Sequence, residues 1–227
     1  MIPIEMIVDR QIKRWELERR ISAGTKEEPS KPGPIITISR QRGSGGSLVA
    51  AKLAELTGFS HINREIIDQI SLEIGTQKRL VESLDESVQS NFHLWVDGII
   101  RGRIVDASDY MQSLVKIIGA VSHHGKAILV GRGANFIAQG TNAFHVRIVA
   151  DFKFRVNSLV NRRGLKAEDA EQEINENDKQ RKKFIKSHFE RDIDDPIAYD
   201  LVINSTYLDV DKIAGMILNA YPLKIHG

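Results

Sequence analysis

A Gly-rich turn near the start of the chain carries residue types that bind phosphate. A β-branched run leads into the turn, which reads RQRGSGGS at residues 40–47, and a helical pattern follows at once. Gly43, Gly45 and Gly46 let the backbone turn tightly, so that a phosphate can approach its N–H groups. The helix that begins near Ser47 adds its positive N-terminal end, which favours an anion. The turn therefore predicts a phosphate-binding site.

The side chains of the turn strengthen this prediction, although its sequence departs from the standard pattern. Ser44 and Ser47 offer hydroxyl donors. Arg40 and Arg42 carry planar guanidinium groups that match the oxygens of a phosphate. The standard phosphate-binding turn reads G-x-x-x-x-G-K-[ST], and its lysine is missing here. A Gly-rich turn that only connects a strand to a helix is the alternative interpretation.

Strands and helices alternate after residue 34, and the first strand positions the turn. The predicted strands cover residues 35–39, 59–62, 126–131, 143–149 and 200–204, and the predicted helical segments cover 47–57, 64–74, 77–124, 151–163, 167–188 and 209–220. This order is typical of an α/β protein with a central parallel sheet and helices on both faces. Ligands bind such sheets beyond the carboxyl ends of the strands, which is where the Gly-rich turn lies.

Residues 1–22 are predicted to form an amphipathic helix that precedes the α/β domain. Its apolar stripe consists of Ile4, Val8, Ile12 and Trp15. We expect this stripe either to dock a partner, as in a homodimer, or to pack on the domain of the same chain. Residues 23–34 hold three prolines and two glycines and predict a linker, so the domain should span residues 35–227.

Composition excludes several classes of function. The chain of 227 residues has no cysteine, which excludes disulfides, thiol catalysis and cysteine-bound metals. Its net charge of +2 is too small to indicate nucleic-acid binding, and no apolar segment reaches the length of a membrane span. The charged N-terminal segment is unlike a signal peptide, and we expect a cytoplasmic protein without nucleic-acid or membrane partners. His123 and His124 lack the spacing of metal ligands and are expected in a solvent-facing loop.

Four segments beyond the turn complete a recognisable order of motifs. They read AILVGRGANFIA at residues 127–138, HVRIVADFKFRVNSLVNRRG at 145–164, NDKQRKKFIKSHF at 177–189 and YDLVINSTYLDVDKIAGMIL at 199–218. With the turn and the elements around it, they resemble the cytidylate kinase-like family, a branch of the nucleoside monophosphate kinases. The resemblance covers nearly everything after the predicted linker.

The resemblance implies a P-loop kinase fold of three layers, with a helical acceptor-binding insert at residues 75–125 and a mobile lid at 162–191. It also implies that ATP and Mg²⁺ serve to phosphorylate a nucleoside monophosphate, with an acceptor of the CMP or dCMP type favoured. In such kinases the closed lid excludes water from the transferring group. Mg²⁺, lysine and arginines stabilise the charge of that group.

The resemblance also assigns roles to residues in the matched segments. Arg132 matches the arginine of the GRD turn of cytidylate kinases, and the segment around Asp178 matches the lid. The predicted catalytic residues are Arg42, Arg132, Asp178 and Arg181; the predicted ATP-binding residues are Arg40, Gly43, Ser44, Gly45, Gly46 and Ser47; the predicted acceptor contacts are Arg101 and Arg103. No metal ligand is assigned beyond a contact of Ser47 with the Mg²⁺ that ATP carries.

Three positions depart from the family pattern. Gly46 and Ser47 stand where the phosphate-binding lysine is expected, Val130 replaces an acidic residue near the metal, and Gly133 replaces one that helps to recognise the pyrimidine nucleotide. We expect Arg40 or Arg42 to supply the missing charge. Two alternatives to a nucleoside monophosphate kinase stay open: a catalytically weak, nucleotide-binding regulatory module, and a kinase of a non-nucleotide small molecule.

Overall fold

The computed structural model describes residues 4–24, 33–84 and 86–225 and contains a five-stranded sheet. Its strands are β1 (Ile35–Arg40), β2 (Ser60–Ile62), β3 (Ala127–Val130), β4 (Ala143–Val149) and β5 (Leu201–Asn204). Their order is β2-β3-β1-β4-β5, and all neighbouring pairs are parallel. The predicted α/β class with a central parallel sheet is confirmed. Because β1 is the central strand, the turn that follows it lies between the ends of β3 and β4.

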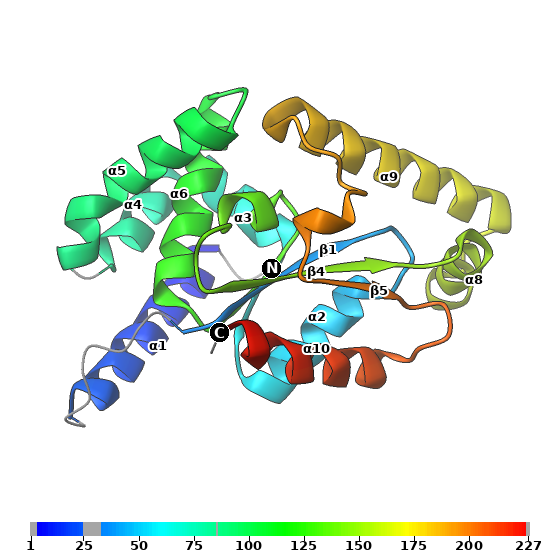
Figure 1. Ribbon diagram of the computed structural model, residues 1–227, viewed down its shortest axis with the longest axis horizontal. Helices are drawn as coiled ribbons and strands as arrows, with labels where there is room; N and C mark the ends of the chain where they lie inside the picture. Colours follow the sequence, from blue (N-terminus) through cyan, green and yellow to red (C-terminus); the bar gives the residue numbers. More distant parts are fainter. Residues whose placement is uncertain (1–3, 25–32, 85, 226–227) are drawn as a thin grey trace.

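Helices cover both faces of the sheet (Figure 1). They are α1 (Ile4–Gly24), α2 (Gly46–Thr57), α3 (Arg64–Leu72), α4 (Ile74–Glu82), α5 (Glu86–Arg103), α6 (Asp109–His124), α7 (Ala134–Ile137), α8 (Phe152–Arg163), α9 (Ala167–Phe189) and α10 (Val210–Ile225), with a 3₁₀ turn at Pro196–Ala198. The helical stretch predicted over 77–124 consists of separate helices, and the short α7 and 3₁₀ turn are not predicted because they hold too few residues for a periodic pattern. Among the described residues, no helix has the length and apolar character needed to cross a bilayer.

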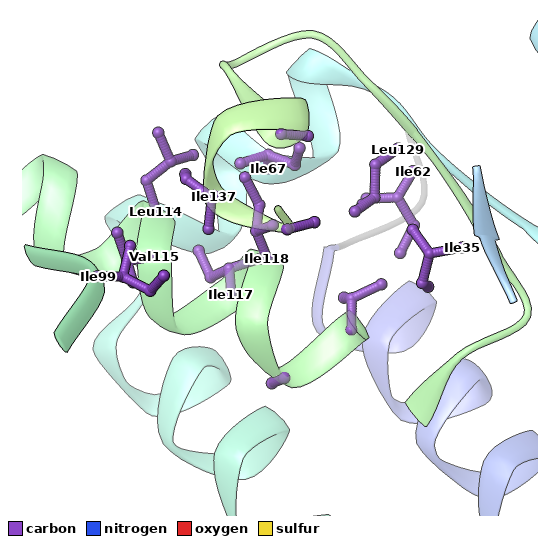
Figure 2. Packing of buried hydrophobic residues seen from close by; sticks show 14 of the residues in the cluster. Ile35, Ile62, Ile67, Ile99, Leu114, Val115, Ile117, Ile118, Leu129 and Ile137 are labelled. Carbon is purple, nitrogen blue, oxygen red and sulfur yellow. The ribbon is translucent and has the colours of Figure 1, made fainter. Parts of the chain in front are cut away.

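Alternation along β1 divides the core into two layers. Ile35 packs with helices on one face of the sheet, whereas Ile36 and Ile38 pack with α2 and α10 on the other. Figure 2 shows the first layer, in which the side chains of Leu129 and Ile62 lie beside Ile35 and those of α6 continue the cluster. A strand of a sheet that is buried on both faces is typically a continuous apolar run, as β3 is. This core holds the carboxyl edge of the sheet in place.

Helix α1 packs on the core of its own chain. Val8 and Trp15 are each 4% exposed and belong to the first layer, and the Trp15 ring stacks on His124 with centroids 3.9 Å apart. The prediction of solvent-facing loop histidines is therefore wrong, since His123 and His124 end α6 and contact aromatic rings. A homodimer through α1 stays a prediction, with Val8 and Trp15 already buried within the chain. Residues 25–32 of the predicted linker lie outside the described residues.

Truncation of Val8 tests whether α1 belongs to the folded domain. Val8→Ala is expected to lower the free energy of unfolding by about 1.5 kcal/mol, because it removes two buried methyl groups. The matched control is Met6→Ala on the same helix, where the side chain is 56% exposed. Chemical denaturation of both variants gives the comparison. Equal stability of Val8→Ala and Met6→Ala would show that α1 is not part of the cooperative unit.

Candidate active site

The turn between β1 and α2 depends on its glycines. Gly43 and Gly45 have φ angles of 83° and 80°, in the left-handed region that favours glycine. A Cβ atom at Gly43 would lie 2.7 Å from the carbonyl oxygen of Arg155 in α8. Both the backbone angle and this close neighbour therefore exclude a side chain at Gly43.

Hydrogen bonds hold the turn in place and leave part of its backbone free. Ser44 is 2% exposed, and its hydroxyl donates to a carbonyl oxygen of the turn itself at 3.0 Å. The Ser205 hydroxyl donates to the carbonyl oxygen of Ser44 at 2.8 Å. Within the described ranges, the N–H groups of Gly45, Gly46 and Ser47 donate to no other backbone group. The start of α2 can therefore accept an anion, whereas the structure directs the Ser44 hydroxyl into the turn and not toward a ligand.

Three adjoining cavities form a cleft at the carboxyl ends of β1 and β3, and Arg40 and Arg181 line all three. The turn cavity, of about 340 Å³, is also lined by Arg42, Ser47, His61, Asn63, Arg64, Glu65, Val130, Glu173 and Asn177. The Arg132 cavity, of about 260 Å³, includes Arg64, Gly131, Arg132, Gly133, Asn135 and Phe184, and the Asp194 cavity, of about 280 Å³, includes Arg147, Asp178, Lys182 and Asp194. The cleft thus surrounds two guanidinium groups at the place where an α/β sheet binds its ligand.

Positive charge is crowded in this cleft. Burial and the neighbouring guanidinium of Arg181 lower the pKa of Arg40 to about 9. Burial also lowers the pKa of Arg181 to about 10, although the carboxylate of Asp178 opposes the shift. Burial and the charge of Arg40 lower the pKa of His61 as well. Each shift disfavours positive charge, so a bound polyanion would relieve the repulsion that contributes to all three.

The guanidinium of Arg42 is already paired. Its Nε donates to Oε1 of Glu173 at 2.8 Å, and its Nη2 donates to the same carboxylate. Arg163 donates two hydrogen bonds to Glu173 as well. The backbone N–H of Arg42 donates to Asp178 at 2.9 Å. Arg42 therefore connects the turn to α9, and in this conformation its guanidinium is paired with a carboxylate.

Helix α9 is tied to the turn and to α8 by the predicted residues Asp178 and Arg181. Asp178 accepts a hydrogen bond from Nη1 of Arg155, and Arg181 Nη1 donates to the carbonyl oxygen of Arg40 at 2.8 Å. Figure 1 shows α8 beyond the ends of the central strands and α9 running back from α8 above the sheet in this view. The structure thus brings both residues to the turn, but only Arg181 lines all parts of the cleft.

Arg132 lies at the carboxyl end of β3 and is held by a carboxylate. Its Nε donates to Oδ1 of Asp68 at 2.7 Å, and its Nη2 donates to Oδ2. The Tyr110 hydroxyl donates to Asp68 at 2.8 Å, and burial together with this hydrogen bond raises the pKa of Tyr110. The guanidinium carbon of Arg132 is 5.3 Å from the centroid of the Phe184 ring. Arg132 lines the cleft, but its fork of donors is directed to α3.

Arg101 and Arg103 lie away from the turn. Arg103 donates to the carbonyl oxygens of Phe136 at 3.3 Å and Gln139 at 2.6 Å. Both arginines line a separate cavity of about 370 Å³ at the C-terminal ends of α5 and α9. None of the three cavities of the cleft includes either residue. In this conformation the predicted acceptor contacts are not brought together with the Gly-rich turn.

Three residues that line the cleft were not predicted from the sequence, namely Arg64, Arg147 and Glu173. Asp68 and Arg155, which bond to Arg132 and Asp178, were not predicted either. Arg64 carries a signal that points to the site, because it opens the helix that follows β2 and so lies at the carboxyl edge of the sheet. The carboxylates carry no comparable signal, since their partners are distant in the sequence.

Packing explains two of the departures from the family pattern. Val130 is 1% exposed and belongs to the core layer beneath α2, where an ionised side chain would lose its hydration. A Cβ atom at Gly133 would lie 2.4 Å from Cε2 of Phe189, so the aromatic ring occupies the space of a side chain. The structure therefore has no room for the acidic group that the pattern places at Gly133.

The turn cavity offers oxygen ligands that fit a metal ion delivered with ATP. Ser47, Asn63 and Glu65 line this cavity, at the start of α2 and α3. Mg²⁺ is usually held by one or two protein oxygens and takes its other ligands from phosphates and water. Among the described residues there is no cluster of three acidic or histidine side chains that forms a metal site by itself. The donors therefore fit a metal that is shared with a triphosphate.

The parallel sheet, the Gly-rich turn at its carboxyl edge and the arginine-lined cleft define a P-loop kinase type of α/β protein. A model of the cytidylate kinase-like family matches residues 35–207. The chain belongs to the cytidylate kinase-like family.

Curated relatives agree with this assignment, and a solved structure shares the fold. A cytidylate kinase of Thermoplasma volcanium is 26% identical over 191 residues, which covers 81% of this chain and 89% of the relative. A cytidylate kinase of Natronomonas pharaonis is 26% identical over 195 residues, which covers 82% and 90%. The crystal structure of an uncharacterized protein from Eubacterium ventriosum superposes with a TM-score of 0.66 at 24% identity and covers 83% of this chain and 98% of that chain. This last likeness shows a shared fold.

Proposed function

We propose that the protein transfers the γ-phosphoryl group of ATP to a nucleoside monophosphate of the CMP or dCMP type. The observation that carries this proposal is the cleft itself, where Ser47 at the start of α2 lines a cavity together with several arginines. Among the described residues, the N–H groups of Gly45, Gly46 and Ser47 donate to no backbone group. Membership of the cytidylate kinase-like family supports a nucleotide kinase. The relatives called cytidylate kinase favour a pyrimidine acceptor.

The triphosphate of ATP would bind along the turn. The N–H groups of Gly45, Gly46 and Ser47 would donate to its β-phosphate, and the positive end of α2 would add to the attraction. Mg²⁺ bound with ATP would neutralise charge between the phosphates, next to Ser47 and Glu65. These backbone groups are held by the hydrogen bonds of the turn, so little reorganisation is needed when the ligand binds.

The transferring phosphoryl group would lie against Arg181 and Arg64. Both side chains line the Arg132 cavity and the turn cavity, so they stand between the proposed donor and acceptor. We propose α9 as the lid, with Asp178 holding it against the turn and excluding water. The acceptor phosphate would lie in the Arg132 cavity, close to Arg64 and Arg132, and not at Arg101.

A phosphotransfer assay tests the proposed function. ATP and Mg²⁺ are offered with CMP, dCMP, UMP, AMP or GMP, and both ADP and the nucleoside diphosphate are quantified. We expect CMP or dCMP to give the fastest formation of diphosphate. Absence of every diphosphate product, with ATP still bound, would contradict the proposal and favour a regulatory nucleotide-binding module.

The contact of Phe189 with Gly133 favours one further candidate. Because the ring fills the place of the base-recognising acid, the Arg132 cavity also suits an acceptor without a pyrimidine. A kinase of a non-nucleotide small molecule would show slow ATP hydrolysis that none of the five monophosphates stimulates. The same assay therefore separates the two candidates.

A further inference from the structure

We infer that Arg40 takes the place of the missing lysine and that Gly46 is glycine because the side chain of Arg40 occupies its surroundings. The inference rests on the proposed function, since it names the cation that contacts the triphosphate. It also means that the arginine at position 40 and the glycine at position 46 depend on each other. An arginine at position 40 and a lysine at position 46 are predicted to be incompatible.

The register of the turn shows an exchange of residue types. When G-x-x-x-x-G-K-[ST] is aligned on Gly45 and Ser47, its first glycine falls on Arg40 and its lysine falls on Gly46. The chain therefore has a cation where the standard turn has glycine, and a glycine where the standard turn has the cation. The number of positive charges at these two positions is unchanged.

The structure shows why the two positions depend on each other. A Cβ atom at Gly46 would lie 2.6 Å from Cβ of Arg40 and 3.1 Å from its Cγ. These atoms are the root of the arginine side chain, so they cannot move away without the backbone. A Cβ atom at Gly131 would lie 2.4 Å from Nη1 of Arg40, so the other end of the side chain rests on a second glycine. The side chain of Arg40 thus packs against two glycines, Gly46 and Gly131.

The guanidinium of Arg40 is free to bind a ligand. In the part of the chain that the structure describes, its Nε is buried without a hydrogen-bond partner. Arg40 lines all three cavities of the cleft, and among the described residues it forms no ion pair with a carboxylate. Arg42 differs, because Glu173 already accepts the hydrogen bonds of its guanidinium. The lowered pKa of Arg40 agrees with a cation that lacks its anion.

A reciprocal exchange tests the inference. The proteins compared are the parent, Arg40→Gly, Gly46→Lys and the double variant Arg40→Gly/Gly46→Lys, which restores the standard turn. Binding of ATP with Mg²⁺ and of inorganic tripolyphosphate is measured by calorimetry, and circular dichroism checks the fold. Lys153→Ala, which removes an exposed positive charge at the start of α8, is the control for net charge.

Each single variant is expected to bind tripolyphosphate about 100-fold more weakly, and the double variant to recover to within about tenfold of the parent. Gly46→Lys is also expected to unfold at a lower temperature than the double variant. Arg40→Met keeps the apolar stem of the side chain and shows whether the charge is what matters. Parent-like binding by a folded Arg40→Met, or a folded double variant that binds no better than the single variants, would overturn the inference.

The outcome separates this inference from the proposed function. If the double variant recovers tripolyphosphate binding but the parent turns over none of the monophosphates, the exchange is supported and the kinase activity is contradicted. Turnover by the parent with no recovery in the double variant would support the kinase and contradict the exchange. A parent that binds neither ATP nor tripolyphosphate would contradict both.

Discussion

Replacement of Arg181 by glutamine is expected to lower kcat/KM for phosphoryl transfer by about 100-fold or more. Arg181 lines every cavity of the cleft and lies on α9, so its position depends on how that helix packs against the turn. A charge that meets the phosphoryl group mainly in the transition state lowers kcat and kcat/KM together when it is removed. We therefore expect the KM for ATP to change much less than kcat.

Two further variants sharpen the Arg181 experiment. Arg181→Lys keeps the charge but loses the planar pair of donors, so we expect an activity between those of the parent and the glutamine variant. Lys183→Ala removes an exposed charge two residues along α9 and is expected to match the parent. A glutamine variant that raises only the KM would show that Arg181 binds the ground state and does not act on the transferring group.

The elements of the fold follow from local patterns that the sequence displays. Strand β1 and helix α2 are recognisable because β-branched residues give way to glycines and then to a helical repeat. The boundaries within residues 77–124 are not recognisable, because the connections between α4, α5 and α6 are short and lack prolines. The burial of Val8 and Trp15 depends on a tertiary contact that the pattern of α1 leaves open.

The partners of the site residues are harder to predict than the residues themselves. The sequence marks Arg42 and Arg132 as cations near the phosphate loop, and the structure places both at the cleft. Their carboxylate partners, Glu173 and Asp68, are 131 and 64 residues away in the chain, so no spacing rule connects the pairs. The difference between a paired arginine and a free one, as at Arg40, exists only in three dimensions. The steric contacts at Gly46 and Gly133 can likewise be recognised only from the three-dimensional structure.

Asp178→Ala is expected to lower the free energy of unfolding by about 3 kcal/mol, which corresponds to a fall in Tm of about 8 °C for a chain of this size. The side chain of Arg155 is 9% exposed and donates to Asp178, so loss of the carboxylate leaves a buried guanidinium without its charged partner. The same change frees the backbone N–H of Arg42. Helix α9 would then lose a contact that ties it to the turn, and Mg²⁺-ATP would protect the variant less against heat.

A double-mutant cycle decides whether the pair or the single charge matters. Asp178→Ala/Arg155→Met removes both partners and is expected to be more stable than Asp178→Ala alone, because a buried unpaired charge costs more than an apolar replacement of the pair. Glu176→Ala is the control on the same helix, since that exposed carboxylate bonds only to Gln172 among the described residues. If Asp178→Ala unfolds at the temperature of the control, Asp178 does not hold α8 and α9 together. The lid would then have to be positioned by Glu173, whose carboxylate joins Arg42 of the turn to Arg163 of α8.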